Sequence, residues 1–187
     1  PLEEKGLIGY GMNTNSLCYV LVSNFKPFRK PGDQKGAKFR VPPAPLFVEM
    51  TKAGPGASCI TMEFAEVPTA LQTGAVDGLL SSVDTGYASK IHELTKYYVC
   101  GSVLGPSPNI ILYNKTFWDG LPKDLRDILV KKVMPENLEY NCNLCISEFD
   151  KCIAGYKAQG DMYILDEAPN LAEWEEALSP VRDMYIK

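Results

Sequence analysis

Short apolar runs alternate with amphipathic stretches along the whole chain. Runs of about four to eight apolar residues predict strands; they lie at 6–10, 17–23, 38–41, 58–62, 75–80, 97–104, 109–113 and 162–165. Apolar residues at steps of three and four predict helices; these lie at 46–52, 84–94, 124–158 and 171–184, with a short helix around Phe117 and Trp118. This alternation predicts an α/β layered fold.

The stretch EFAEVPTALQTGAVDG, residues 63–78, predicts a tight helix–strand unit. Pro68 falls in the first turn of the helix, where an N–H has no intrahelical partner and its loss costs nothing. Gly74 ends the helix. Asp77 is expected to accept hydrogen bonds from backbone donors near a turn, and Gly78 to allow another backbone to approach closely.

Two other features concern the chain path. Turn-forming residues at 13–16 predict a turn between the first two strands. The long helical region contains Pro135, which is expected to kink or split it, and Gly160 should end it.

Composition limits the function. The 187 residues suit a single domain, with 45% hydrophobic and 22% charged residues. The net charge of −4 argues against nucleic acid or an anionic membrane surface as the main partner. The longest apolar run, LCYVLV at 17–22, is far shorter than the roughly 20 residues that a bilayer requires. The sequence begins PLEEKG, without an initiator methionine or a signal peptide, so its start does not indicate a compartment.

Six cysteines are present, and two form a C-x-x-C pair, Cys142 and Cys145. This spacing is compatible with a redox or metal site. The alternative is an apolar helical stripe, because Leu138, Cys142, Cys145, Phe149, Cys152 and Tyr156 recur at steps of three and four. The stripe is favoured, since there is no second C-x-x-C. Cys142, Cys145 and Cys152 are therefore expected to be reduced, metal-free and largely buried.

Catalytic patterns are missing from the sequence. It contains neither a G-x-G-x-x-G fingerprint nor a P-loop. The single histidine, His92, lies in the charged segment KIHELTKYY, which favours a solvated or capping role over that of a general base. Glu148 and Asp150 are two residues apart on a helix, so they do not face each other as an acid–base pair. The sequence predicts neither an enzyme nor a cofactor.

Four motifs occur in a characteristic order: AKFRVPPAP at 37–45, ITMEFAEVPTALQTGAVDG at 60–78, SKIHELTKYY at 89–98 and NIILYNKTFWDGLPKDLRDIL at 109–129. Together they resemble the solute-binding proteins of tripartite ATP-independent periplasmic (TRAP) transporters, over roughly residues 5–165. The resemblance implies a lobe like that of type II periplasmic binding proteins. Such a lobe has a mixed sheet flanked by helices and a long C-terminal helix.

The resemblance also implies a domain organisation and partners. Family members have two lobes with the ligand between them, in about 300 residues. This sequence matches the second lobe and the crossing segments, so we expect residues 1–187 to form one α/β domain with the first lobe absent. The expected partners are a small organic acid and a TRAP membrane permease, in the periplasm.

Arg40 matches the family arginine that pairs with the ligand carboxylate. Its guanidinium offers two parallel N–H donors, and Val41-Pro42-Pro43 should hold it rigidly at the end of a strand. Without the resemblance, a surface arginine on a loop would be the simpler interpretation. Phe64 matches an aromatic residue that walls the family's cleft, and a core phenylalanine is the alternative.

Four further residues are assigned to the ligand site by the resemblance. Ser81 and Ser82 stand where the family carries polar or carboxamide residues, and Asn109 stands where a family strand approaches the cleft. Tyr19 occupies the place of a second arginine in some members, so a strongly dianionic ligand is not expected.

Two functions remain open. The first is a non-catalytic lobe that binds a small carboxylate through Arg40. The second is a stand-alone lobe that acts as an oligomerising or interaction module, because exposed apolar surface drives self-association. On either interpretation Arg40 is expected to face open solvent, binding of monocarboxylates is expected to be weaker than ~1 mM, and a homodimer is expected to cover the face around Arg40 and Phe64.

Overall fold

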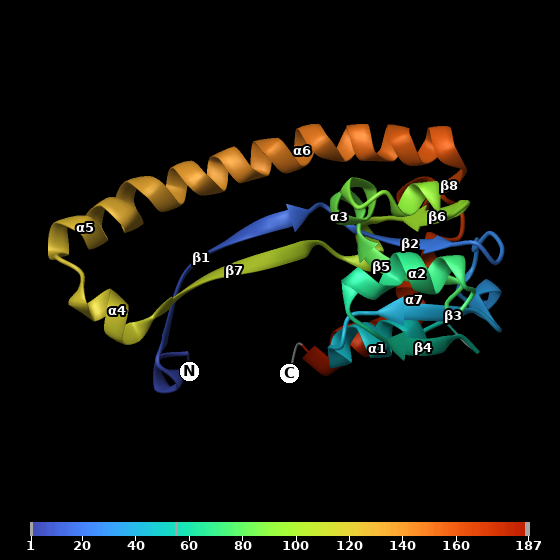
Figure 1. The fold of residues 1–187 in the computed structure, drawn as a ribbon, viewed down its shortest axis with the longest axis horizontal. Helices are drawn as coiled ribbons and strands as arrows, with labels where there is room; N and C mark the ends of the chain where they lie inside the picture. The colour runs from blue at the N-terminus through green and yellow to red at the C-terminus, as the bar shows by residue number, and fades with distance from the viewer. Residues whose placement is uncertain (1, 55, 186–187) are drawn as a thin grey trace.

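The computed structural model describes residues 2–54 and 56–185, which form a layered α/β body and a projecting two-stranded ribbon (Figure 1). The strands are β1 (Leu7–Ser16), β2 (Tyr19–Ser23), β3 (Lys38–Val41), β4 (Ser58–Thr61), β5 (Gly78–Ser82), β6 (Tyr97–Cys100), β7 (Ser107–Asn114) and β8 (Asp161–Ile164). The helices are α1 (Pro45–Lys52), α2 (Val67–Gln72), α3 (Val83–Ala88), α4 (Lys115–Gly120), α5 (Lys123–Ile128), α6 (Met134–Gln159) and α7 (Leu171–Tyr185).

The body contains a six-stranded sheet in the order β4-β3-β5-β2-β6-β8. Strand β2 runs antiparallel to both of its neighbours, while the remaining pairs are parallel, so the predicted mixed sheet is confirmed. The carboxyl ends of the five parallel strands therefore share one edge with the start of β2. We call it the carboxyl edge; it comprises Val41, Thr61, Ser82, Cys100, Ile164 and Tyr19.

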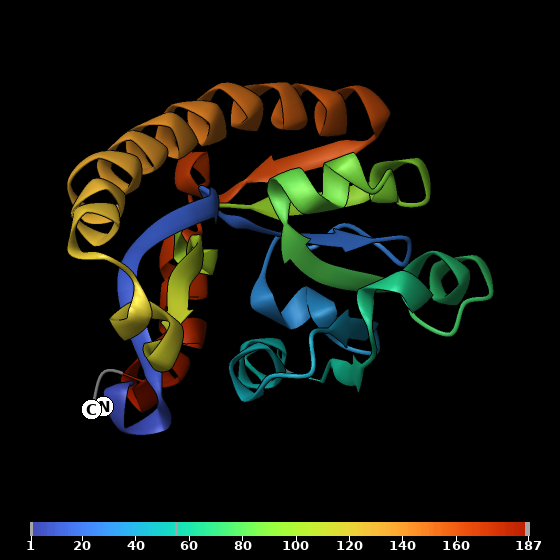
Figure 2. The same cartoon turned by 60° about the vertical axis from the view of Figure 1, so that its left-hand side comes forward.

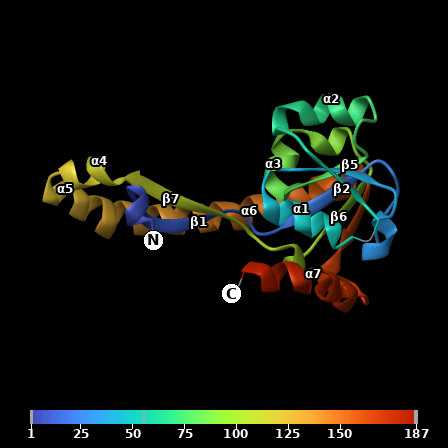
Figure 3. The ribbon, with the colours of Figure 1, turned by 90° about the horizontal axis from the view of Figure 1, so that it is seen from below.

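Two apolar cores cover the two faces of this sheet. The first core lies under α2, α3 and α6, and includes Val20, Val22, Val67, Leu71, Leu79, Val83, Ile91, Tyr98 and Tyr156. The second core lies under α1 and α7, and includes Leu21, Phe28, Phe39, Val41, Leu80, Val99, Leu165 and Trp174. Figure 3 shows α2 and α3 on one side of the sheet and α7 on the other. Because adjacent strand residues point to opposite faces, neighbouring positions serve different cores.

The ribbon consists of β1 and β7, which pair antiparallel from Leu7↔Asn114 to Ser16↔Ser107. Since β1 leads into β2 and β7 follows β6, the ribbon leaves the body at the carboxyl edge. The helical run of α5 and α6 returns along it to the sheet in a bowed path (Figures 1 and 2). A π-helical turn, Leu129–Val133, joins these two helices just before Pro135, which lies in the first turn of α6. The predicted irregularity near Pro135 is confirmed, because proline has no N–H to complete a regular helical ladder.

The local predictions for the helix–strand unit at residues 63–78 are confirmed. Pro68 stands in the first turn of α2, and Gly74 has a left-handed backbone with φ +70°. The backbone N–H of Lys38 donates to Asp77 Oδ2 at 2.8 Å. A Cβ at Gly78 would lie 2.1 Å from the backbone oxygen of Val22, so only glycine allows the two strands to come this close.

Several predicted boundaries were wrong. Residues 13–16 form no turn but continue β1, because β7 pairs with them. The helix expected at 84–94 ends at Ala88, and a separate 3-10 turn, Ile91–Glu93, follows Lys90, which has φ 59°. The strand expected at 97–104 ends at Cys100, where the chain turns toward the ribbon.

His92 is half-buried in the last turn of the 3-10 helix Ile91–Glu93, so its ring is less solvated than the sequence predicts. Its ring stacks on Tyr87, with centroids 4.2 Å apart and an interplanar angle of 17°, and meets Tyr156 edge-on. Among the described residues, its buried Nδ1 has no hydrogen-bond partner. Burial lowers the pKa of His92; Glu93 opposes this shift and Lys90 adds to it.

The stability of the fold should therefore depend on pH through His92. Because the folded-state pKa is lowered, the unfolded chain binds more protons near the ordinary pKa of about 6.5. The contribution of the neutral His92 ring to the free energy of unfolding is therefore fully present above about pH 6.5, and it is lost as the pH falls through the folded-state pKa. Thermal melts from about pH 8 to about pH 5.5 should show a flatter profile for His92→Phe, which keeps a ring on Tyr87. Identical pH slopes in the two proteins would contradict this role.

The predicted apolar stripe on α6 packs on the first core at Phe149, Cys152 and Tyr156, whereas its first residue, Leu138, is exposed. Cys152 is buried and burial raises its pKa to about 11. Cys142 and Cys145 are only half-buried, so the expectation that all three are largely buried was wrong for these two. The reason is that α6 lies over the ribbon in this region, where the cover is thinner than over the sheet. In residues 2–54 and 56–185, no group of His, Cys, Asp and Glu is suited to hold a metal ion.

Candidate functional site

Arg40 lies in β3 at the carboxyl edge and is buried, with 4% of its surface exposed. Its Nε–H donates to the carbonyl oxygen of Met62 at 3.0 Å. The guanidinium carbon lies 5.3 Å from the ring centroid of Phe64, within cation–π range. The expectation that Arg40 faces open solvent was therefore wrong, because Phe64 and the chain after β4 cover it within this body.

The charge of Arg40 survives its burial. Burial lowers the pKa of the guanidinium, and the nearby carboxylate of Glu63 opposes that shift. Arginine stays protonated in proteins, so the site holds a positive charge at neutral pH. Within the described part of the chain, the only hydrogen bond of this side chain is the one from Nε to Met62. The two Nη nitrogens are thus available to an oxygen ligand.

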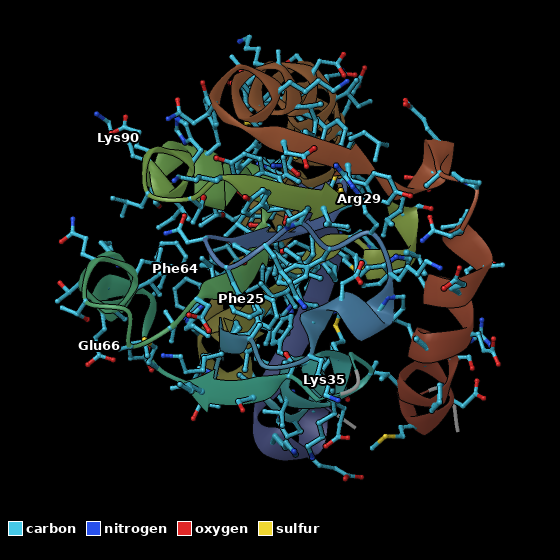
Figure 4. All side chains as sticks on the ribbon, turned by 90° about the vertical axis from the view of Figure 1, so that its right-hand side faces the viewer. Phe25, Arg29, Lys35, Phe64, Glu66 and Lys90 are labelled. Atoms are coloured by element: carbon cyan, nitrogen blue, oxygen red, sulfur yellow. The ribbon has the colours of Figure 1, made fainter. Side chains whose placement is uncertain are left out.

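Phe64 begins a 3-10 helix, Phe64–Glu66, directly before α2. Figure 4 labels Phe64 and Glu66 on this segment. The ring is partly buried and packs on the first core. The cleft-wall and core interpretations are thus compatible, because one part of the ring packs inward while another meets the guanidinium of Arg40.

Ser81 and Ser82 point to opposite faces of the sheet. Ser81 pairs with Val20 and shares the face of Arg40. It lies beneath α3, since a Cβ built at Gly86 would be 3.5 Å from its Oγ. Ser82 pairs with Tyr19 on the other face. Both serines are buried. Because they face opposite sides of the sheet, they do not belong to one polar cluster.

Tyr19 borders a groove of about 760 Å³ on the sheet face that carries the second core, between α1, α7 and the 3-10 turn Ser102–Leu104. Its hydroxyl donates to Ser107 Oγ at 3.3 Å, and its ring meets Phe47 edge-on with centroids 5.4 Å apart. Neither Ser107 nor Phe47 could be identified from the sequence as a partner of Tyr19. Their contact with Tyr19 depends on the start of β7 and on α1, which no local pattern connects to position 19.

Asn109 stands apart from the other candidates. It is exposed on the ribbon and pairs with Asn13 across β1 and β7. The structure therefore brings Arg40 and Phe64 into contact, places Tyr19 beside Ser82 on the opposite face, and leaves Asn109 on the ribbon beyond the carboxyl edge.

This arrangement suits binding more than catalysis. A buried cation with free, coplanar N–H groups beside an aromatic ring can hold a planar carboxylate. The carboxyl edge is also the usual ligand position in open α/β sheets. Among the helices of the described residues, none is both long and apolar enough to cross a bilayer.

An α/β lobe with a cationic fork at the carboxyl edge of its sheet has the architecture of a solute-binding protein. The chain belongs to the bacterial extracellular solute-binding protein family 7, whose family model matches residues 1–187. The predicted membership of the TRAP solute-binding family is confirmed. Proteins of this family serve transporters and are non-enzymatic, in agreement with the prediction of no enzyme.

Similar proteins extend this assignment. The chain is 33% identical over 183 residues to the C4-dicarboxylate-binding periplasmic protein DctP of Rhodobacter capsulatus, covering 97% of this chain and 54% of the relative. It is 31% identical over 187 residues to the 2,3-diketo-L-gulonate-binding periplasmic protein YiaO of Escherichia coli, covering 100% and 55%. A crystal structure of a TRAP periplasmic solute-binding protein from Desulfovibrio salexigens with bound orotic acid has a TM-score of 0.81 at 28% identity, covering 99% and 58%. The chain thus spans about half the length of these relatives.

Proposed function

We propose that this chain is a solute-binding lobe of a TRAP transporter that holds a small organic acid by its carboxylate through Arg40. The observation that carries the proposal is the buried guanidinium of Arg40, which lies against Phe64 and, among the described residues, donates a hydrogen bond only from Nε. Its Nη groups supply two parallel donors, and the low local dielectric strengthens each hydrogen bond that they make.

The ligand class follows from the charge and from the relatives. Within residues 2–54 and 56–185 no carboxylate forms an ion pair with Arg40, and a buried cation in that state favours an anionic ligand. The three relatives above are named for, or hold, a C4-dicarboxylate, 2,3-diketo-L-gulonate or orotic acid, each of which is a carboxylate. Tyr19 in place of a second cation favours an acid with one charged carboxylate near the protein.

The proposed setting is the periplasm, with a TRAP membrane permease as the receiving partner. The support is family membership, because the family's members are periplasmic proteins of transporters. Catalysis and cofactors play no part in this function.

We also propose that residues 1–187 form one lobe with the connecting ribbon of a two-lobed protein. The support is the apolar surface that this body leaves uncovered on the ribbon, on α4 and on the long helical run. It includes Met12, Ile110, Leu112, Phe117, Leu125, Ile128 and Tyr140. Ile110 alone is 62% exposed. A lobe packed there would face the carboxyl edge and close the site over Arg40.

The binding proposal predicts that carboxylates, but not their neutral amides, bind this chain. NMR titration with a panel of 2-oxo acids, dicarboxylates and sugar acids, each beside its amide, measures the difference. We expect the acids to bind with dissociation constants above ~1 mM, because one lobe contacts the ligand from one side only. Shifts should centre on Arg40 and Phe64. Equal binding of acid and amide would contradict a carboxylate site.

Self-association is a second candidate function, favoured by the same exposed apolar surface. A two-fold pair of chains would bury the ribbon and the face of the long helix. Light scattering over a range of protein concentrations tests it. We expect the mass to rise with concentration, and Ile110→Lys to abolish the rise; a monomer at every concentration excludes this candidate.

A further inference from the structure

The edge of the sheet opposite the carboxyl edge carries an excess of positive charge. Strands β3, β4, β5, β6 and β8 begin at this amino edge, and β2 ends there. The connector at 24–37, which leads from β2 to β3, therefore lies along it. This connector contains four cations and one carboxylate, Asp33, in a chain whose net charge is −4. Lys96 adds a further cation directly before β6, where its backbone N–H donates to the carbonyl oxygen of Ser23 at 3.1 Å.

An exposed aromatic ring stands among these cations. Phe25 is 47% exposed, and Nζ of Lys26 lies 5.2 Å from the centroid of its ring. The ring lies against Gly36, since a Cβ built there would be 4.0 Å from Phe25 Cζ, and Lys35 is the adjacent residue. Figure 4 looks onto this edge and labels Phe25 near the middle of the face, with Lys35 below it. We call Phe25, Lys26, Lys35 and Lys96 the amino-edge patch.

The lysines of this patch have no carboxylate partner. Within residues 2–54 and 56–185, Lys26, Lys35 and Lys96 form no ion pair. Arg29, in the same connector, is already paired with Asp161 at 2.5 Å and is not counted in the patch. Several lysines outside the patch pair with a carboxylate on their own helix: Lys52 with Glu49, Lys115 with Asp119, Lys123 with Asp127 and Lys151 with Glu148. The charge of the patch is thus available to a partner outside the chain.

We propose that the amino-edge patch binds the anionic headgroup surface of a phospholipid bilayer. Lysines close to such a surface are attracted by its negative potential, and aromatic rings favour the layer between headgroups and acyl chains. An acidic protein could neutralise the lysines, but the exposed ring of Phe25 among them favours a partner that is anionic and apolar on one surface. A bilayer of anionic lipid offers both properties.

The net negative charge of the chain does not prevent this contact. The sequence-wide charge argues against a membrane surface as the main partner, but charges separated by more than about 8 Å are largely screened at physiological ionic strength. The patch also lies at the opposite edge of the sheet from Arg40, so a docked protein keeps its carboxyl edge directed away from the lipid. The proposal therefore does not depend on the proposed function, and organic acid binding should be the same with and without vesicles.

Sedimentation of the whole chain with lipid vesicles tests the proposal. One set of vesicles contains phosphatidylcholine alone, and the other contains equal parts of phosphatidylcholine and phosphatidylglycerol, in about 0.1 M salt. We expect binding to the anionic vesicles only, and less binding as the salt concentration rises. Lys26→Gln/Lys35→Gln should weaken it about twenty-five-fold, at about five-fold for each lysine. Lys123→Gln/Lys132→Gln removes the same charge at the far end of the ribbon and should bind like the parent protein (Figure 1).

A fluorescent ring at position 25 reports whether the aromatic side chain enters the lipid. The two tryptophans of the chain, Trp118 and Trp174, are both buried, so their emission should not respond to vesicles. In Phe25→Trp we expect a blue shift of the emission with anionic vesicles and no shift with phosphatidylcholine. Circular dichroism checks that each variant is folded.

Three results would overturn the proposal. The first is a parent protein that does not sediment with anionic vesicles, or a Lys26→Gln/Lys35→Gln protein that binds as well as the matched control. The second is displacement by free glycerol phosphate at the same phosphate concentration, which would indicate a site for a single anion. The third is displacement by polyglutamate together with no blue shift in Phe25→Trp, which would assign the patch to an acidic protein. None of these results bears on organic acid binding, which is measured without lipid.

Discussion

Replacement of Arg40 by glutamine is expected to weaken organic acid binding at least about thirty-fold, which leaves no detectable binding, because loss of one partner of a buried charge pair costs about 2 kcal/mol or more and millimolar binding is worth only about 4 kcal/mol. The carboxylate would lose its charged partner in a buried position, where hydrogen bonds to a charged group are strongest. Arg40→Lys keeps the charge but loses the planar fork and the Nε bond to Met62, so it should lose a substantial part of this affinity. NMR titration with the tightest acid of the panel measures both.

A matched arginine elsewhere distinguishes local from general effects of charge. Arg126 lies on α5, away from the carboxyl edge, and Arg126→Gln removes the same charge. It should bind the acid as the parent does. Circular dichroism must show that the Arg40 variants are folded. A folded Arg40→Gln protein with unchanged affinity would remove Arg40 from the site and leave the groove beside Tyr19 as the alternative.

Local chemistry explains which parts of the fold could be predicted. Pro68, Gly74, Asp77 and Gly78 act within one helix–strand unit, so residue type and spacing sufficed. The full length of β1 could not be predicted in this way. Its last residues look like turn formers, and their strand conformation depends on β7, far along the chain. Tertiary pairing overrides local preference in such cases.

In the candidate site, too, local features could be predicted from the sequence and contacts between distant segments could not. Arg40 could be chosen from its motif, but its burial depends on Met62 and Phe64, which follow a different strand. For the serines a usable pattern was present, because adjacent strand residues face opposite sides, so Ser81 and Ser82 could have been separated from the sequence alone. The groove beside Tyr19 could not, since α1 and α7 meet there from distant positions.

Gly78→Ala is expected to prevent stable folding. The added Cβ would lie 2.1 Å from Val22 O and 3.0 Å from both Phe39 Cε1 and Ser23 Cα. Strand β5 is paired on both sides at this position, with Ser23 of β2 and Phe39 of β3, so it has no direction in which to retreat. A backbone clash in a central strand belongs to the rare substitutions that cost more than about 4 kcal/mol. That is comparable to the whole stability of a domain, about 5–15 kcal/mol.

Two other glycines isolate the steric cause. Gly120 has open space for a Cβ and no positive φ, so Gly120→Ala should change the free energy of unfolding by no more than about 1 kcal/mol. Gly74 also has open space, but its φ is +70°, so Gly74→Ala should cost about 1–2 kcal/mol through backbone strain alone. Urea unfolding followed by circular dichroism ranks the three variants. A free energy of unfolding for Gly78→Ala within about 1 kcal/mol of that of the parent protein would contradict this prediction. It would mean that β5 can shift to make room for the Cβ, so the close pairing of β2, β3 and β5 at the centre of the sheet would be wrong.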